Sequence, residues 1–166
     1  MGDAFPSYPL RVTDIKIREA TTADARRLAE LRYEFRCGLA GVVEDREPFI
    51  ERCSAWMASR IAGDWKCWVA SREGTIVGQV WLHRIEKMPN PVGHPEVHAY
   101  ITNLYVKPDS RGGVGGRLLA QALEWARQQA VDAVILWPTP RSRSLYQRHG
   151  FEAPADMLEL RRLSPF

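Results

Sequence analysis

The segment "DSRGGVGGRLL", residues 109–119, places four glycines within five residues and then becomes strongly apolar. Glycine inside a helix costs about 1 kcal/mol relative to alanine, so this composition needs a purpose where a helix is about to start. Glycine permits positive φ and the close approach of a ligand, and the first turn of a helix offers unpaired N–H groups. The segment therefore predicts an anion site, most typically for phosphate, with a plain turn and tight helix packing as the alternative.

The residues on either side of the glycines predict a strand, a loop, a helix and a second strand. "VHAYITNLYV" (97–106) is rich in β-branched and aromatic residues, "RLLAQALEWARQQA" (117–130) is strongly amphipathic, and "DAVILW" (132–137) is typical of a short buried strand. This succession implies a βαβ crossover. A P-loop would end in Gly-Lys-Ser/Thr and a dinucleotide loop would follow the first strand of its fold, so a pyrophosphate of another kind is the better interpretation.

The rest of the chain completes one α/β domain with a mixed central β-sheet flanked by helices. Residues 1–12 are expected to form a flexible N-terminal tail and residues 13–166 the domain. The expected element order is β-α-α-β-β-β-α-β-α-β. Besides the elements above, we expect strands at 14–20, 65–71 and 75–85, with 72–74 as a hairpin connection, a helix from Thr21 or Thr22 to Gly38, helices at 49–63 and 141–150, and a last strand at 156–163.

Composition excludes several classes of protein. The 166 residues carry a net charge of +3, and their basic residues are scattered among acidic ones, which argues against a nucleic-acid partner. No apolar run reaches the roughly 20 residues that span a bilayer, and the first residues do not resemble a signal peptide. Three cysteines without CxxC spacing suggest reduced thiols. We therefore expect a cytoplasmic protein without a membrane partner or a metal site.

The chain resembles the GNAT superfamily of N-acetyltransferases over nearly its whole length, from "IKIREATTADARRLAEL" (15–31) to "DMLELRRL" (156–163). The most specific portions are "NLYVKPDSRGGVGGRLL" (103–119) and "LYQRHGF" (145–151). The family's pyrophosphate signature is Q/R-x-x-G-x-G/A. If the signature is aligned by counting back from Leu118 and Leu119, Ser110 occupies its Q/R position. If it is aligned by counting forward from Pro108, Arg111 occupies that position, and both alignments stay open. The resemblance implies the GNAT fold and acetyl-CoA as the acyl-donor cosubstrate.

The same resemblance implies which residues hold acetyl-CoA. The backbone of the glycine segment would cradle the pyrophosphate, the strand before it would pair with the pantetheine arm, and an arginine before the last helix would reach the 3′-phosphate. A solvated loop side chain is the alternative for that arginine. These coenzyme residues are Leu104, Tyr105, Val106, Arg111, Gly112, Gly113, Val114, Gly115, Gly116 and Arg141.

The catalytic groups implied by the resemblance are an acid and a base. Tyr146 matches the family tyrosine that often protonates the coenzyme A thiolate, and a phenol with a pKa of about 10 is protonated at neutral pH. Simple packing is the alternative for this ring. Many relatives have a glutamate where this chain has Asn103, so the base is open. The candidates are Glu96 and His98, followed by Glu86 and Glu34.

The resulting hypothesis is an enzyme that moves an acetyl group from acetyl-CoA to a primary amine of a small molecule by direct attack. Alternatives are a non-catalytic acyl-CoA sensor and a protein N-terminal or lysine acetyltransferase. Glu44, Asp45 and Glu47, in the connection between the first two helices, would attract a cationic amine if they face the acceptor, and would otherwise form a solvated turn. Homodimers are common in the family, so a homodimer is one option for this chain.

Overall fold

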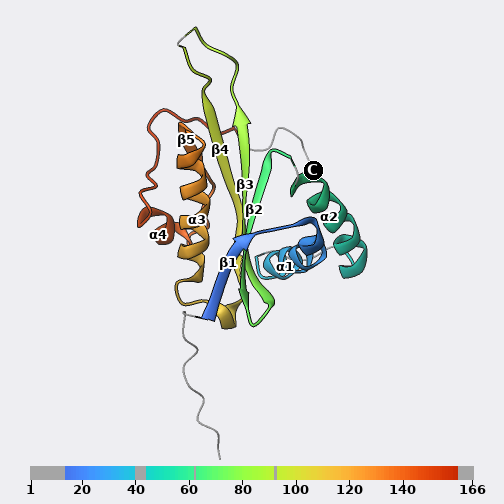
Figure 1. Cartoon of the computed structure of the whole chain (residues 1–166). Helices are drawn as coiled ribbons and strands as arrows, with labels where there is room; N and C mark the ends of the chain where they lie inside the picture. Colours follow the sequence, from blue (N-terminus) through green and yellow to red (C-terminus); the bar gives the residue numbers. More distant parts are fainter. Residues whose placement is uncertain (1–13, 40–43, 62, 92, 161–166) are drawn as a thin grey trace, which may run out of the picture.

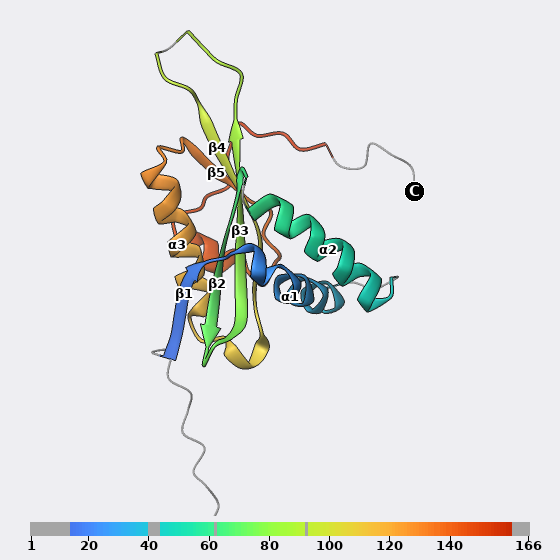
Figure 2. The same cartoon turned by 45° about the vertical axis from the view of Figure 1, so that its right-hand side comes forward.

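The computed structural model describes residues 14–39, 44–61, 63–91 and 93–160. Its centre is a five-stranded mixed sheet in the order β1-β2-β3-β4-β5, antiparallel except for the parallel pair β4–β5. Two helices cover each face of the sheet, α1 and α2 one face, α3 and α4 the other (Figures 1 and 2). The elements are β1 (Ile15–Glu19), α1 (Ala25–Cys37), α2 (Arg46–Ile61), β2 (Trp65–Arg72), β3 (Thr75–Glu86), β4 (Val97–Val106), α3 (Val114–Gln128), β5 (Ala133–Ile135) and α4 (Arg143–Gln147), with short 3-10 turns at Thr22–Asp24 and Pro108–Ser110.

This architecture confirms the expected mixed sheet and most of its elements, but the last strand predicted at 156–163 is wrong over 156–160. Residues 151–160 contain no strand, and residues 161–163 lie outside the described ones, as does the tail expected over 1–12. Leu158 and Leu160 are 99% and 78% exposed. Their alternation with polar residues looked like a strand pattern, but neither side chain is buried against the sheet.

The hairpin between β2 and β3 is tighter than predicted. Arg72 pairs with Thr75, so the connection has two residues and not three. Both turn residues, Glu73 and Gly74, have positive φ, at 48° and 80°. This is the pattern of a type I′ turn, whose twist matches that of the flanking strands.

Alternation along β3 builds a separate core on each face of the sheet. Val80 and Leu82 face α3, whereas Trp81 between them faces α1 and α2, as the two-residue period of a strand requires. A buried Gln79 joins β3 to α1: its Nε2 donates to the carbonyl of Leu28 at 3.0 Å, and its Oε1 accepts from Trp81 Nε1 at 2.8 Å. Leaving such a buried amide unsatisfied would cost about 1–3 kcal/mol, so this contact fixes the position of α1.

Candidate functional site

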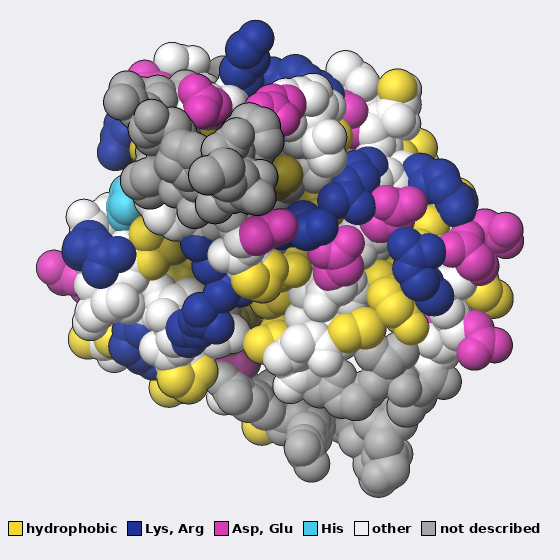
Figure 3. All heavy atoms as spheres, turned by 90° about the horizontal axis from the view of Figure 1, so that it is seen from below, with side chains coloured by type: hydrophobic (Ala, Val, Ile, Leu, Met, Phe, Trp, Pro, Cys, Tyr) yellow, Lys and Arg dark blue, Asp and Glu magenta, His cyan; other side chains and the backbone are white. Residues whose placement is uncertain are grey.

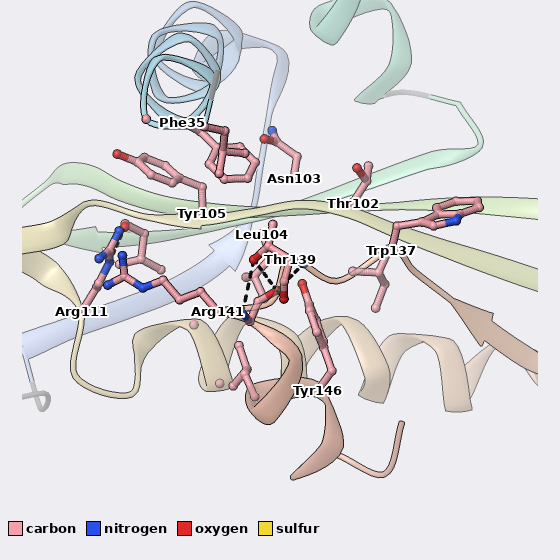
Figure 4. A pocket seen from close by; sticks show the side chains of 18 of the residues that line it. Phe35, Thr102, Asn103, Leu104, Tyr105, Arg111, Trp137, Thr139, Arg141 and Tyr146 are labelled. Carbon is pink, nitrogen blue, oxygen red and sulfur yellow. Dashed lines mark hydrogen bonds between the residues drawn. The ribbon is translucent and has the colours of Figure 1, made fainter. Parts of the chain in front are cut away.

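The sheet opens between its two parallel strands. β4 and β5 pair only where His98–Tyr100 meets Ala133–Ile135, after which β4 runs on to Val106 while the chain after β5 diverges from it. A cavity of about 1030 Å³ fills this opening (Figure 4). A strand edge left without a neighbouring strand presents backbone N–H and C=O groups. The cavity therefore offers an extended ligand a backbone edge to pair with.

A β-bulge interrupts β4 in the middle of this edge. The pairing register between β3 and β4 shifts between Gln79 and Trp81, and Asn103 has a φ of 53°. Asparagine tolerates this left-handed conformation better than most residues do. The side chain of Asn103 lies on the α1 side of β4, where its Oδ1 accepts a hydrogen bond from Arg32 Nη1 at 3.2 Å (Figure 4). Conformation thus gives a physical reason for asparagine at this position.

The glycine segment enters α3 at one end of the cavity. Gly112 and Gly113 have φ values of 86° and 96°, so both adopt a backbone conformation that side-chain-bearing residues avoid. Gly113 is the N-cap of the 15-residue helix α3. The unpaired N–H groups of the first turn and the positive end of the helix dipole favour an anion here.

The structure gathers the predicted coenzyme residues around this one cavity. Nine of the ten line it. The exception is Val114, which is buried in the core. The nine are Leu104, Tyr105, Val106, Arg111, Gly112, Gly113, Gly115, Gly116 and Arg141. Their proximity supports a common site, while binding of acetyl-CoA itself stays a prediction.

The cavity wall is strongly cationic. Among the described residues that line it, the only carboxylate is that of Glu34, which lies 3.6 Å from Arg27 Nη1. Lys and Arg side chains also gather around a hollow on the face seen from below (Figure 3). Charges of one sign that line a cleft raise the local concentration of the opposite charge. The lining arginines are Arg32, Arg36, Arg111, Arg141 and Arg148.

Tyr146 points into the cavity from α4 (Figure 4). The helix is held in place at Ser142, whose Oγ accepts the Thr139 N–H at 2.9 Å and whose own N–H donates to Thr139 Oγ1 at 3.3 Å. The ring of Tyr146 packs edge-on against Phe151 at 5.7 Å. Burial, with a smaller contribution from Tyr100, raises the pKa of Tyr146 to about 12. The phenol therefore keeps its proton throughout the neutral range.

The candidate bases at the start of β4 do not reach the cavity. Glu96 pairs with Lys87 and lies 3.1 Å from His98, and neither Glu96 nor His98 is among the lining residues. His98 precedes Asn103 by five residues, which is about 16 Å along a strand. Glu86 pairs with Arg84 and also lies outside the cavity wall. A role of Glu96 or His98 as the base stays a prediction without geometric support.

Acidic residues before α2 and in its first turn also pair elsewhere. Glu44 pairs with Arg52, and Glu47 pairs with Arg26 at 2.8 Å. Neither of these carboxylates, nor that of Asp45, lines the cavity. The sequence suggested that these carboxylates attract a cationic amine, but none of them is placed to do so in the cavity.

Several lining residues were missed from the sequence. Arg32 lies four residues after the buried Leu28, on the face of α1 that packs inward, and a charge on an apolar helix face was the available signal. Trp137 follows β5, and the ends of parallel strands commonly carry binding residues. Phe35, Thr139 and Arg148 also line the cavity, and no local pattern marked them.

Comparison with known proteins identifies the class. The model of the acetyltransferase (GNAT) family matches residues 26–151, about three quarters of the chain, so the protein belongs to this family. No curated protein matches the chain. Among the residues that the structure describes, no helix is both long and apolar enough to cross a membrane.

Solved structures share the fold at low sequence identity. A predicted acetyltransferase from Clostridium acetobutylicum, solved with acetyl-CoA, has a TM-score of 0.71 and 21% identity over 88% of this chain and 95% of its own. Glucosamine-6-phosphate N-acetyltransferase from Arabidopsis thaliana has a TM-score of 0.63 and 17% identity, over 88% and 97%. An aminoglycoside acetyltransferase from an uncultured soil metagenomic sample, in complex with trehalose, has a TM-score of 0.67 and 16% identity, over 93% and 99%.

Proposed function

We propose that the protein transfers an acetyl group from acetyl-CoA to a primary amine of a small molecule by direct attack of the amine. One observation carries this proposal. A single cavity contains the glycine entry to α3, the open edge of β4 and the Tyr146 side chain. These features match the successive needs of a phosphate-bearing thioester: an anion cradle, an edge that pairs with amide groups, and a proton donor.

The chemistry of the cavity fits the coenzyme. Its phosphates require positive charge, which Arg111, Arg141 and Arg148 supply together with the start of α3. The volume of about 1030 Å³ lies at the upper end of ordinary ligand pockets, which run from about 300 to 1,000 Å³. When bound, acetyl-CoA supplies an activated thioester, and the backbone at Leu104 and Tyr105 would hold it along β4.

Tyr146 serves as the proton donor in this proposal. With its pKa raised to about 12, the Oη proton remains in place at every ordinary pH. A positioned acid of this kind contributes about 10²–10⁴-fold to a reaction rate by protonating a leaving group in the transition state. The proton on Oη is therefore in place when the thiolate departs, although the raised pKa makes this phenol a weaker acid than an exposed tyrosine, so that its contribution comes from its position. After the transfer, bulk solvent restores the proton.

The cationic wall helps the amine to react without a strong base. Nearby positive charges disfavour the protonated form of an amine and so lower its pKa. Arg32 and Arg36, the two lining arginines that are not assigned to the coenzyme phosphates, drive the acceptor toward its neutral, nucleophilic form, and the amine loses its proton to solvent. This account explains how Asn103 can stand where many relatives have a glutamate.

The small-molecule acceptor is supported by the kinds of neighbours that share the fold. The names of two of them, the glucosamine-6-phosphate N-acetyltransferase and the aminoglycoside acetyltransferase, refer to small amine-bearing molecules. A cytoplasmic location and a homodimer remain predictions from the sequence.

The test is release of coenzyme A thiol from acetyl-CoA with a panel of primary amines. We expect amine-dependent thiol release, reduced about 100-fold in Tyr146→Phe. Binding of acetyl-CoA without thiol release with any amine would favour the sensor. Release only with peptides that carry a free N-terminus or lysine would instead indicate a protein acceptor.

A further inference from the structure

Arg32 differs from Arg26 and Arg27 of the same helix. Arg26 and Arg27 each pair with a carboxylate, Glu47 and Glu30 respectively, both at 2.8 Å. Within the described residues, no carboxylate lies within ion-pair distance of Arg32, although this side chain is half-buried. A partly buried cation without a counter-ion is costly, and an anion that binds beside it removes that cost.

The surroundings of Arg32 orient it without neutralising it. Its Nη1 donates to Asn103 Oδ1 at 3.2 Å, and its guanidinium carbon lies 5.9 Å from the centroid of the Phe35 ring. The other groups that face it electrostatically are Arg36, Cys53 and Tyr100. Burial foremost, followed by Arg36, lowers the pKa of Arg32, and smaller opposing contributions from Cys53 and Tyr100 do not offset this shift.

Arg32 is separate from the arginines that fit the coenzyme phosphates. It belongs to α1 on one face of the sheet, whereas Arg141 and Tyr146 reach the cavity from the opposite side of β4 (Figure 4). Residues suited to hold a second ligand, Thr102 and Trp137, line the cavity as well. The acceptor therefore has a cation of its own, apart from those near the start of α3.

We propose that Arg32, oriented by Asn103, binds an anionic group of the acceptor, so that the substrates are amines that also carry a carboxylate or a phosphate. This inference rests on the proposed function and narrows its substrate class. The planar guanidinium presents several N–H donors in a fixed arrangement that suits the oxygens of either group. A purely cationic amine would meet repulsion from the arginines of the wall.

The experiment compares amines that differ only in the anionic group. The pairs are α-amino acids against their amides, and glucosamine 6-phosphate against glucosamine. Each amine is titrated by calorimetry into protein saturated with coenzyme A, which cannot donate an acetyl group, and is then assayed for thiol release with acetyl-CoA. Because binding is read without turnover, the result does not depend on whether the proposed reaction occurs.

We expect at least one member with the anionic group to bind about tenfold or more tightly than its partner without that group, the range for a hydrogen bond to a charged group. Arg32→Gln should reduce that ratio to about one while leaving acetyl-CoA affinity within about twofold. The control is Arg26→Gln, which removes the same charge from the same helix outside the cavity wall and should preserve the ratio.

Three results would overturn the inference. These are equal or weaker binding of the anionic members in every pair, no binding of any amine, and an Arg32→Gln variant that loses acetyl-CoA affinity but keeps the anionic preference. Anionic preference in binding without thiol release would uphold the inference and contradict the proposed reaction. Thiol release only with the amines that lack an anionic group would uphold the reaction and contradict the inference.

Discussion

The two sides of the open edge of β4 are built in different ways. The side toward α3 uses one continuous segment, residues 111–116, whose backbone forms the cradle at the start of the helix. The side toward α1 joins Arg32 to Asn103, which are 71 positions apart. The proposed coenzyme side thus depends on local backbone conformation, whereas the proposed acceptor side depends on tertiary packing. We therefore expect coenzyme binding and the choice of substrate to be separable by mutation.

The largest effect is expected on the coenzyme side. In Gly113→Glu, a residue with a side chain must adopt a backbone φ of 96°, and a carboxylate is placed at the proposed site of the coenzyme phosphates. We expect acetyl-CoA affinity to fall about 1,000-fold, or about 4 kcal/mol, in a calorimetric titration. The control is Gly93→Glu, which introduces the same charge at a φ of 84° outside the cavity wall. Equal losses in both variants would attribute the effect to strain and not to the cradle.

Tyr146→Phe should separate catalysis from binding. We expect kcat to fall about 100-fold, because the proton donor is lost, while acetyl-CoA affinity stays within about twofold, because the ring still packs on Phe151. With a pKa of about 12, Tyr146 remains protonated as the pH rises from 7 to 10, so the wild-type rate should show no loss from this group in that range. Parallel losses of kcat and affinity would assign Tyr146 to packing.

A substitution of Asp24, at the entry to α1, should lower the unfolding free energy of the protein. Asp24 forms two 2.8 Å hydrogen bonds with Arg18 on β1 and accepts the Thr21 N–H at 2.8 Å. The hydrogen bond from Arg18 is the main cause that lowers the pKa of Asp24 to about 2. Asp24→Asn should cost about 1 kcal/mol of unfolding free energy at pH 7, a figure that allows for the exposure of Arg18.

The stability that Asp24 contributes depends on pH because the pKa of Asp24 is lowered in the folded state. Because the pKa of Asp24 is lower in the folded state, its contribution is complete above pH 4 and disappears as the pH falls from about 4 to about 2. Denaturant unfolding at pH 7 and pH 2 measures the difference in unfolding free energy between wild type and Asp24→Asn. The control is Glu124→Gln, which breaks an exposed ion pair with Arg127. A difference between wild type and Asp24→Asn that persists at pH 2 would contradict the ion-pair explanation.

An effect on stability of similar size is expected at the bulge. Asn103→Ala and Asn103→Gly both remove the amide that contacts Arg32, but only glycine accepts a φ of 53° without strain. We expect the alanine variant to be about 1 kcal/mol less stable than the glycine variant, as measured by urea unfolding. Equal stabilities would indicate that the left-handed backbone at this position is not maintained. Both variants should weaken the anionic preference, since Arg32 loses its partner.

Prediction from the sequence succeeded where a feature is local and failed where it is tertiary. The glycine segment could be placed at the start of α3 because its spacing within a strand–loop–helix unit is fixed by backbone geometry, whereas Tyr146 was identified from its match to the family tyrosine. Both line the cavity, and their roles remain predictions. The left-handed bulge at Asn103 could not, since it arises from the pairing of β4 with β3. The prediction of the last strand was wrong for a related reason. Apolar and polar residues alternate in this segment as they do in a strand, but no neighbouring strand of the described sheet pairs with it, and Leu158 and Leu160 are exposed.

The central claim is that the cavity beside α3 is built for acetyl-CoA. Calorimetric titration of the purified protein with acetyl-CoA, alongside ATP and NADH, tests it most directly. The account predicts micromolar binding of acetyl-CoA and much weaker binding of the other two. No binding of acetyl-CoA, or equal affinity for ATP, would show that the glycine segment serves as a turn or as a general phosphate site, and would contradict the claim.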